Sequence, residues 1–226
     1  MRLNAVYKAG FLLCLAAGCT VNRPGGVHDR PSLVPMRTLN RPPRVAPDRR
    51  TASTVVSDPR FAWFLHARAW RPRGGISNRW NAIVIHHSGS RSGNARLFDR
   101  HHRRDNGWDE LGYHFVIGNG RGSGDGQVEV GPRWIKQKHG AHCKTSDNYY
   151  NNHGIGVCLV GDFRTTAPTK AQMEALVRLV RFLMVECRIG AKNVKTHRGV
   201  TGKTICPGPK FPFKSFRRMI GPHSGS

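Results

Sequence analysis

Residues 83–90 read IVIHHSGS, a short apolar run that ends in two histidines. Consecutive β-branched residues of this kind favour a buried β-strand, which we place at residues 81–86. Because side chains alternate between the two faces of a strand, only one of His86 and His87 can face a given site. The same short stretch therefore predicts part of a core and one candidate functional side chain.

Two further residues of metal-ligating type lie much later in the chain. His197 and Cys206 are nine positions apart, in a segment that Gly199 and Gly202 mark as a loop able to turn both side chains inward. An open zinc site takes three ligands of the His, Cys, Asp or Glu type and leaves a fourth position to water. His86, His197 and Cys206 would supply that set. Taken one at a time, each has a simpler interpretation as a satisfied polar group or a small buried hydrophobe.

The rest of the chain alternates between strand-like and helix-like patterns. Residues 94–104 place Ala95, Phe98 and His102 at helical spacing, which predicts a helix. A length of 226 residues does not demand a second domain, so the pattern indicates one α/β domain in which helices pack against a sheet. Apolar runs predict the remaining strands at residues 113–117, 127–130 and 154–160.

A glycine-rich segment at residues 118–126 joins two of these strand-like runs. It lacks the Gly-Lys-Ser/Thr ending of a phosphate-binding loop, so we interpret it as the turn of a β-hairpin. The clearest helix begins after Thr169, which has capping-box spacing with Gln172, and Gly190 marks its end. Its apolar stripe is predicted to be core and comprises Met173, Leu176, Val177, Val180, Leu183 and Met184.

The first 18 residues have the pattern of an export signal. Two basic residues precede an apolar run at 9–17 that is too short to span a bilayer as a mature helix. Residues 15–19 read LAAGC, which resembles the lipobox of bacterial lipoproteins and implies acylation of Cys19. The alternative is an ordinary secretory signal that is cut nearby. Either way we expect an exported protein, and in the first case a membrane-anchored lipoprotein that faces the periplasm or cell wall.

The segment at residues 19–58 is dense in Pro, Arg and Ser and shows no sustained strand or helix period. Such a segment cannot bury enough surface to offset its ordering entropy, so we predict a disordered tether. A coil of this length has an r.m.s. span of roughly 35 Å, which would let an anchored domain sample a nearby polymer. We assign residues 59–222 to the folded domain and residues 223–226 to a tail.

The chain is strongly basic. It has 37 Lys and Arg against 13 Asp and Glu, a formal net charge of +24 and a sequence pI of about 11.2. Nucleic acid is the usual first partner for such a charge, but no helix-turn-helix, zinc-finger spacing or aromatic RNA-binding motif accompanies it. An export signal also separates the chain from nucleic acid. Anionic envelope polymers and lipid head groups fit better, and a general solubility field is the simplest alternative.

Five blocks of sequence occur in a fixed order along the chain: IVIHHSGS at 83–90, GWDELGYHFVIG at 107–118, HGAHC at 139–143, GIGVCLVGDF at 154–163 and HRGVTGKTICPGP at 197–209. In that order they resemble one enzyme family, the zinc-dependent N-acetylmuramoyl-L-alanine amidases, which include phage lysozyme-type amidases and peptidoglycan recognition proteins. The resemblance covers about residues 60–220 and implies a peptidoglycan recognition protein-like fold, a single domain with a mixed central β-sheet flanked by α-helices.

The resemblance implies hydrolysis of the amide between N-acetylmuramic acid and L-alanine in peptidoglycan. It selects His86 rather than His87 as a zinc ligand, together with His197 and Cys206. We expect Zn²⁺ as the cofactor, peptidoglycan as the partner and a monomer. Two alternatives stay open: a peptidoglycan-binding lipoprotein without catalysis, and a basic polyanion-binding lipoprotein in which zinc is structural.

The resemblance also implies roles for residues around the ligands. Tyr113 occupies the family tyrosine, whose phenol could orient water or donate to the oxyanion. The family's Lys or Thr two positions before the last ligand falls on Thr204, whereas the lysine counted forward from His197 falls on Lys203. We favour Thr204 and keep both. His114, the next strand residue after Tyr113, is expected to be structural.

His142 matches a family histidine that lines the substrate groove, and Trp108 could offer a flat surface to sugar or peptide, although ordinary packing is its simpler interpretation. Relatives that trim soluble anhydro-muropeptides carry a glutamate where this chain has Cys158, so the resemblance places the burden of catalysis on zinc and Tyr113. Cys143 and Cys187 also remain unassigned. Because three cysteines are an odd number, at most one bridge can form among them.

Overall fold

One mixed sheet forms the centre of the computed structural model, which describes residues 69–221. Its five strands lie in the order β3-β2-β4-β1-β5. All neighbours are parallel except β2 and β3, which form the antiparallel hairpin predicted around the glycine-rich turn. The strands are β1 (Ala82–His87), β2 (Phe115–Ile117), β3 (Val128–Val130), β4 (Gly154–Leu159) and β5 (Val194–Thr196).

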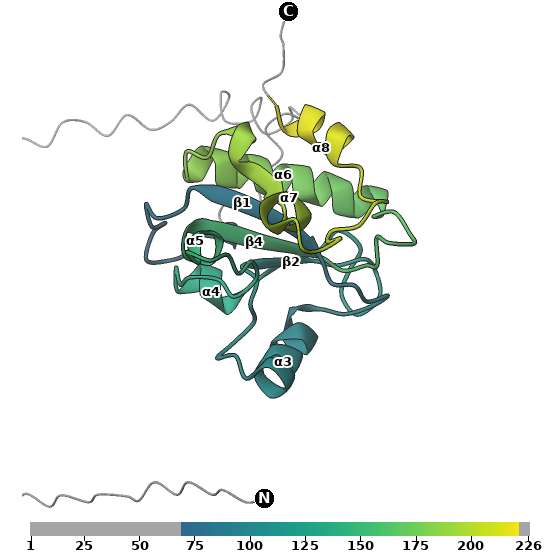
Figure 1. Cartoon of the computed structure of the whole chain (residues 1–226), viewed down its shortest axis with the longest axis horizontal. Helices are drawn as coiled ribbons and strands as arrows, with labels where there is room; N and C mark the ends of the chain where they lie inside the picture. Colours follow the sequence, from purple (N-terminus) through teal and green to yellow (C-terminus); the bar gives the residue numbers. More distant parts are fainter. Residues whose placement is uncertain (1–68, 222–226) are drawn as a thin grey trace, which may run out of the picture. The chain divides into compact units, whose positions relative to one another are not determined.

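Helices flank this sheet, so the predicted single α/β domain is confirmed. In Figure 1, α6 and α8 lie on one side of the strands and α3 lies on the other. No helix among residues 69–221 combines the length and apolarity needed to cross a membrane. The helices are α3 (Ala95–Asn106), α4 (Pro132–Ile135), α5 (Tyr149–His153), α6 (Lys170–Glu186), the 3-10 turn η1 (Ala191–Asn193), α7 (His197–Thr201) and α8 (Phe213–Ile220).

The α6 helix begins at the predicted capping box. The Thr169 hydroxyl accepts a hydrogen bond from the Gln172 amide at 3.0 Å, and the Gln172 side chain accepts one from the Thr169 amide at 3.2 Å. Its predicted stripe is core, since Leu176, Val180 and Leu183 are fully buried. The helix ends at Glu186, before Gly190, because Arg188 adopts a left-handed conformation with φ of 55°.

The two faces of the sheet differ in composition because side chains alternate along each strand. Ile83 and Ile85 of β1 join the main core beneath α6 and α8, together with Val157 of β4. The residues between them point to the opposite face, where Val116 and Cys158 form a second, much smaller apolar cluster. The histidine at position 86 belongs to that second face.

The segment after β5 differs from the predicted loop. Residues His197–Thr201 form the short helix α7, because the Thr196 side chain accepts a hydrogen bond from the Gly199 amide at 3.0 Å and caps the first turn. The left-handed Gly202 then ends the helix, with φ of 65°. The export signal with Cys19, the tether at 19–58 and the tail at 223–226 lie outside the described residues.

Candidate metal centre

Parallel pairing of β1 and β5 brings two histidines to the same level. Ile85 is the register partner of Thr196, so the next residue of each chain segment, His86 and His197, lies just beyond the pair. Their ring centroids are 4.6 Å apart. His86 is almost fully buried, whereas His197 is partly exposed at the start of α7.

Cys206 reaches the same place because its segment folds back over α7. The Arg198 amide donates to the Cys206 carbonyl at 2.8 Å, and the His87 amide points at the Cys206 sulfur at 3.4 Å. The sulfur lies 3.8 Å from Nδ1 of His86. The structure therefore brings together all three of the side chains that the sequence nominates as zinc ligands.

The donor atoms of His86, His197 and Cys206 all lie within 4.8 Å of one another. Tetrahedral zinc with bonds of about 2.3 Å to sulfur and 2.0–2.1 Å to nitrogen would hold the two atoms about 3.6 Å apart. The observed 3.8 Å between sulfur and Nδ1 fits that spacing. Within residues 69–221, no fourth His, Cys, Asp or Glu joins the group, so a zinc ion here would keep an open position.

Burial sets the protonation of these groups. It lowers the pKa of His86 well below its usual value, and the nearby His142 and His197 lower that pKa further, so the His86 ring is neutral at neutral pH. Burial raises the pKa of the Cys206 thiol to about 11, although the hydrogen bond from the His87 amide lowers that pKa by a smaller amount. A bound cation would therefore displace the thiol proton.

His87 points to the other face of β1, as strand alternation requires. Its Nδ1 accepts a hydrogen bond from the Phe163 amide at 3.1 Å, and the two rings lie 5.8 Å apart. The selection of His86 over His87, which the sequence reached only by resemblance, thus has a geometric basis.

Tyr113 lies beside the candidate ligands. Its ring centroid is 5.3 Å from that of His86, and its side chain lines a cavity of about 880 Å³ between α3 and the loop that follows β1. Burial, as the main cause, raises the pKa of the phenol well above its usual value, with smaller contributions from Cys158 and Cys206. The phenol is therefore a hydrogen-bond donor at neutral pH.

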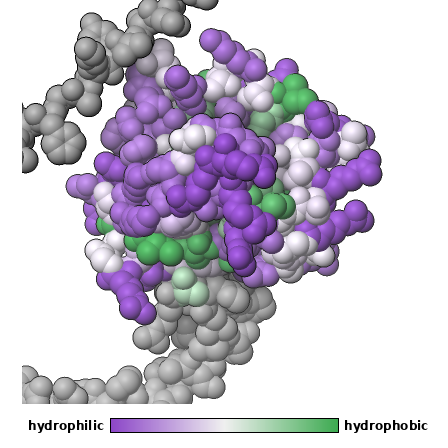
Figure 2. Space-filling view, turned by 90° about the horizontal axis from the view of Figure 1, so that it is seen from below, coloured by the Kyte–Doolittle hydropathy of each residue, from purple (hydrophilic) through white to green (hydrophobic). Residues whose placement is uncertain are grey.

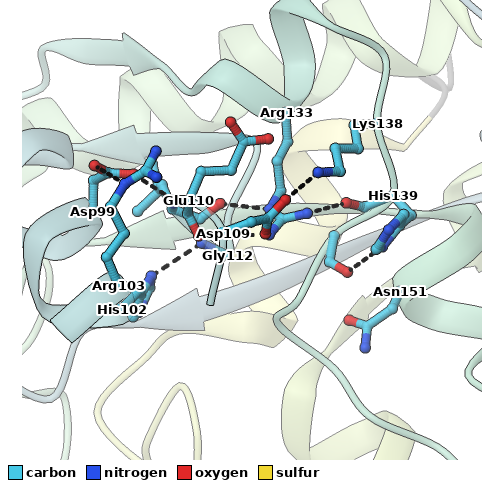
Figure 3. Close-up of polar contacts among 12 residues, drawn as sticks. Asp99, His102, Arg103, Asp109, Glu110, Gly112, Arg133, Lys138, His139 and Asn151 are labelled. Atoms are coloured by element: carbon cyan, nitrogen blue, oxygen red, sulfur yellow. Dashed lines mark hydrogen bonds and ion pairs between the residues drawn. The ribbon is translucent and has the colours of Figure 1, made fainter. Parts of the chain in front are cut away.

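A polar scaffold holds the segment that leads into Tyr113 (Figure 3). The buried Arg133 donates to the carbonyls of Leu111 and His139, each at 2.7 Å, and forms an ion pair with Asp109. Asp99 of α3 accepts from the Leu111 amide at 2.6 Å. Arg133 thereby ties the GWDELGY segment to the HGAHC segment on the same side of the sheet.

The cavity beside Tyr113 has a basic wall on α3. Three arginines line it, Arg100, Arg103 and Arg104. Arg103 pairs with Asp99 and Arg104 with Asp105, so Arg100 is the one of the three without an ion pair among residues 69–221. Viewed from the side on which α3 lies, the surface is mostly hydrophilic, with a narrow apolar strip (Figure 2).

His102 is a functional candidate that the sequence analysis missed. It is buried on α3, lines the cavity beside Tyr113, and accepts from the Gly112 amide through Nδ1 at 3.0 Å. Burial, with a smaller effect of His101, lowers the pKa of His102 to about 4, so its Nε2 carries the proton at neutral pH. The sequence did contain a signal for His102, because this polar residue lies at helical spacing on the same inward face as Ala95 and Phe98.

Five of the predicted site residues share a second cavity of about 470 Å³. The Thr204 hydroxyl accepts from the Cys206 amide at 3.1 Å, whereas the Lys203 side chain is exposed. Both positions reach the cavity, so the preference for Thr204 stays a prediction. The five residues are Trp108, His142, His197, Lys203 and Thr204.

The remaining predictions have mixed outcomes. Trp108 lines this cavity but also packs against His102, with ring centroids 4.7 Å apart. His114 is structural, because its two ring nitrogens bond to the Gly156 amide and the Lys138 carbonyl, each at 3.0 Å. The cysteines at 143, 158, 187 and 206 are all free thiols, so no disulfide forms within residues 69–221.

Comparison with known proteins now adds to this geometry. A sequence profile of the N-acetylmuramoyl-L-alanine amidase family matches residues 76–209. The chain belongs to this family. The match begins before β1 and ends just after Cys206, so it contains every candidate ligand and both cavities.

Relatives in sequence have amidase and recognition-protein names. The chain is 32% identical over 120 residues to the human N-acetylmuramoyl-L-alanine amidase, which covers 51% of this chain and 18% of the human protein. It is 33% identical over 111 residues to peptidoglycan-recognition protein LB of Drosophila melanogaster, covering 49% of this chain and 43% of that protein. The chain thus spans less than half the length of these relatives.

Solved structures show the same fold. The endolysin N-acetylmuramoyl-L-alanine amidase LysCS of Clostridium intestinale superposes with a TM-score of 0.54 at 30% identity, over 64% of this chain and 87% of LysCS. Bumblebee PGRP-SA gives a TM-score of 0.50 at 25% identity, over 62% and 81% of the two chains. The amidase fold therefore accounts for most of the described residues.

Proposed function

We propose that this protein hydrolyses the amide bond between N-acetylmuramic acid and L-alanine in peptidoglycan, with zinc as its cofactor. The observation that carries the proposal is the open cluster of His86, His197 and Cys206. Membership of the amidase family supports the substrate class. Zinc, when bound, acidifies water and polarises a carbonyl oxygen.

The chain's own residues supply the rest of the chemistry. The Tyr113 phenol, which stays protonated, donates a hydrogen bond to the oxygen that becomes negative when the amide carbonyl is attacked. Thr204 adds a hydroxyl donor beside the ligands, since its oxygen already accepts from the Cys206 amide. Lys203, at the rim of the same cavity, would instead contribute a positive charge.

The charge of the cavities agrees with a carboxylate-bearing polymer as substrate. Arginines of α3 line the cavity on the Tyr113 side, and Lys144 and Lys203 line the cavity on the His197 side. Positive walls on both sides would attract the acidic groups of a peptide stem before it reaches the ligands. This supports peptidoglycan over a neutral amide.

The open coordination position favours catalysis over the two alternatives. A structural zinc site is normally closed by four protein ligands, and the cluster has three within the described part of the chain. A binding protein without catalysis would need neither these three ligands nor the partly buried Tyr113 beside them. Both alternatives predict a protein that leaves peptidoglycan chemically intact.

An assay of bond cleavage tests the proposal. The purified protein should release new L-alanine amino termini from peptidoglycan without new reducing sugar ends, lose that activity with a chelator, and regain it with Zn²⁺. Cys206→Ser should be inactive under all conditions. Cys187→Ser, at the end of α6 and away from the cluster, is the matched control and should keep activity. An inactive wild-type protein that binds peptidoglycan would instead support the binding alternative.

We also propose that the protein is exported and held at the membrane by a lipid on Cys19. The support is the LAAGC sequence at residues 15–19. Metabolic labelling with a fatty acid analogue should mark the wild-type protein and leave Cys19→Ser unlabelled. Label that persists in Cys19→Ser would refute the anchor.

A further inference from the structure

His142 forms a buried chain of hydrogen bonds that leads to a candidate zinc ligand. Its Nε2 lies 3.1 Å from the Gly154 carbonyl oxygen, and its Nδ1 lies 3.1 Å from Nε2 of His86. The other nitrogen of His86, Nδ1, faces the Cys206 sulfur at 3.8 Å. These contacts connect Gly154, His142 and His86 in succession, from a backbone carbonyl to the candidate metal cluster.

The direction of every hydrogen bond in this chain follows from its first member. A carbonyl oxygen can only accept, so Nε2 of His142 carries a proton. In a neutral ring, Nδ1 of His142 is then an acceptor, and Nε2 of His86 must be the donor. Nδ1 of His86 is left with its lone pair facing the cluster, which is the form that a metal ligand requires.

Glycines hold the His142 ring in this orientation. A Cβ atom at Gly140 would lie 2.4 Å from Cδ2 of the ring, and a Cβ at Gly156 would lie 2.5 Å from the same atom. The ring therefore occupies a slot that any larger residue at either position would fill. Asn151 fixes the backbone below the ring, because its side-chain oxygen accepts from the amides of His142 and Cys143, each at 2.8 Å.

We propose that His142 is a positioning residue that holds His86 in the tautomer with its proton on Nε2 and its lone pair on Nδ1. The inference rests on the proposed metal centre and deepens it. It also refines the expected role of His142 as a groove residue: the side chain does line the second cavity, but both ring nitrogens are engaged within the protein. Partners of this kind orient a ligand and keep its metal-binding nitrogen available.

Nitrogen-15 NMR of histidine-labelled, metal-free protein tests the tautomer directly. Wild-type His86 should show a protonated Nε2 and an unprotonated Nδ1. His142→Leu removes the acceptor, so His86 should populate both tautomers. His142→Gln restores an acceptor and a donor at the spacing of the two ring nitrogens, and should return His86 toward the wild-type spectrum. A wild-type His86 protonated on Nδ1 would overturn the proposal, even if His142→Leu failed to fold.

Zinc affinity, measured by competition with a chelator, gives the second readout. It should fall about 10- to 100-fold in His142→Leu and recover in His142→Gln. His153→Leu is the matched control, because the His153 ring also bonds to a backbone carbonyl, that of Arg79, but makes no hydrogen bond to a ligand, so its zinc affinity should equal that of wild type. Unchanged affinity and tautomer in His142→Leu would refute the role of His142. Failure of the wild type to bind zinc would refute the metal centre. The NMR experiment on metal-free protein would still decide whether His142 sets the tautomer of His86.

Discussion

The two faces of β1 carry opposite chemistry within six residues. Ile83 and Ile85 point into an apolar core that α6 and α8 seal, while His86, one position later, points to a face that holds histidines, glycines and two cavities. The first face is closed by hydrophobic packing and the second by hydrogen bonds such as those of Arg133 and His142. A single strand therefore encodes stability and candidate chemistry by alternation.

Alanine substitution at two adjacent residues should separate these functions most strongly. His86→Ala removes a candidate ligand, so zinc binding should weaken at least about 100-fold and amidase activity should be lost. Ile85→Ala leaves a cavity in the core and should lower the free energy of unfolding by about 2–5 kcal/mol. Chelator competition and urea unfolding measure the two effects.

The two substitutions should differ in which quantity they change most: zinc affinity in His86→Ala, and the free energy of unfolding in Ile85→Ala. Metal-free His86→Ala should lose about 1–3 kcal/mol in the free energy of unfolding, because Nδ1 of His142 loses its donor, but it should bind zinc far more weakly than Ile85→Ala does. Ile85→Ala should bind zinc with wild-type affinity wherever it is folded. If Ile85→Ala lost zinc binding while folded, the two faces would not be independent.

Acid should destabilise the histidine face before the apolar one. Burial, as the main cause, lowers the pKa of both His102 and His142 from 6.5 to about 4. The unfolded chain then binds more protons than the folded chain between these values, so stability is full above pH 6.5 and falls as the pH drops toward 4. Each such histidine contributes a loss of about 3 kcal/mol at the end of this range.

Urea unfolding of the metal-free protein at several pH values between 4 and 7 measures this loss. The pKa values of His86 and His114 are also lowered well below normal, mainly by burial, and add to the same trend. His102→Gln should flatten the pH dependence in part, because one titrating ring is gone. A free energy of unfolding that is constant over this range would contradict the buried, neutral state of these rings.

Much of the apolar face was predictable from sequence. The structure confirms the strands predicted at 81–86 and 154–160 and the apolar stripe of the helix after Thr169. Each of these segments has a regular pattern of apolar residues that is long enough to recognise. The strand β5 and the helix α7 were not predicted, because three and five residues are too few to show a period. The equally short β2 and β3 were predicted because a glycine-rich turn lies between them. The helix α8 also followed a proline-rich stretch that carried no predicted element.

The histidine face was predictable in its members but not in its connections. His86, His197 and Cys206 were nominated by residue type and resemblance, and β1–β5 pairing brings the two histidines together. Hydrogen-bond direction depends on which carbonyl or amide lies beside each ring, and that information is absent from residue spacing. For that reason His142 was expected only to line a groove, and His102 was not expected at the site.

A methyl group added at Gly156 should test how tightly the His142 ring is packed on the histidine-bearing face of the sheet. In Gly156→Ala the new methyl would lie 2.5 Å from Cδ2 of His142, so either the ring or the strand must shift. We expect a loss of about 1–3 kcal/mol in the free energy of unfolding and a zinc affinity about 10-fold weaker.

Gly190→Ala is the matched control for this substitution. Its backbone has φ of −69°, and no atom lies within 4 Å of the new methyl, so stability and zinc affinity should stay near wild type. Wild-type zinc affinity in Gly156→Ala would show that the His142 ring has room to move without disturbing His86.

The smallest expected effect lies on the apolar side, at the start of α6. Thr169→Ala removes the hydroxyl that caps the Gln172 amide and that also bonds to Asp125 at 2.6 Å. The first turn of the helix would lose a partner, which costs about 1 kcal/mol in the free energy of unfolding, and Thr169→Ser should recover most of it. Zinc affinity should not change, because α6 contacts the sheet through the face opposite to His86. Thermal unfolding and chelator competition on the same samples measure both quantities, and a change in zinc affinity would show that capping of α6 is transmitted through the sheet to the candidate ligands.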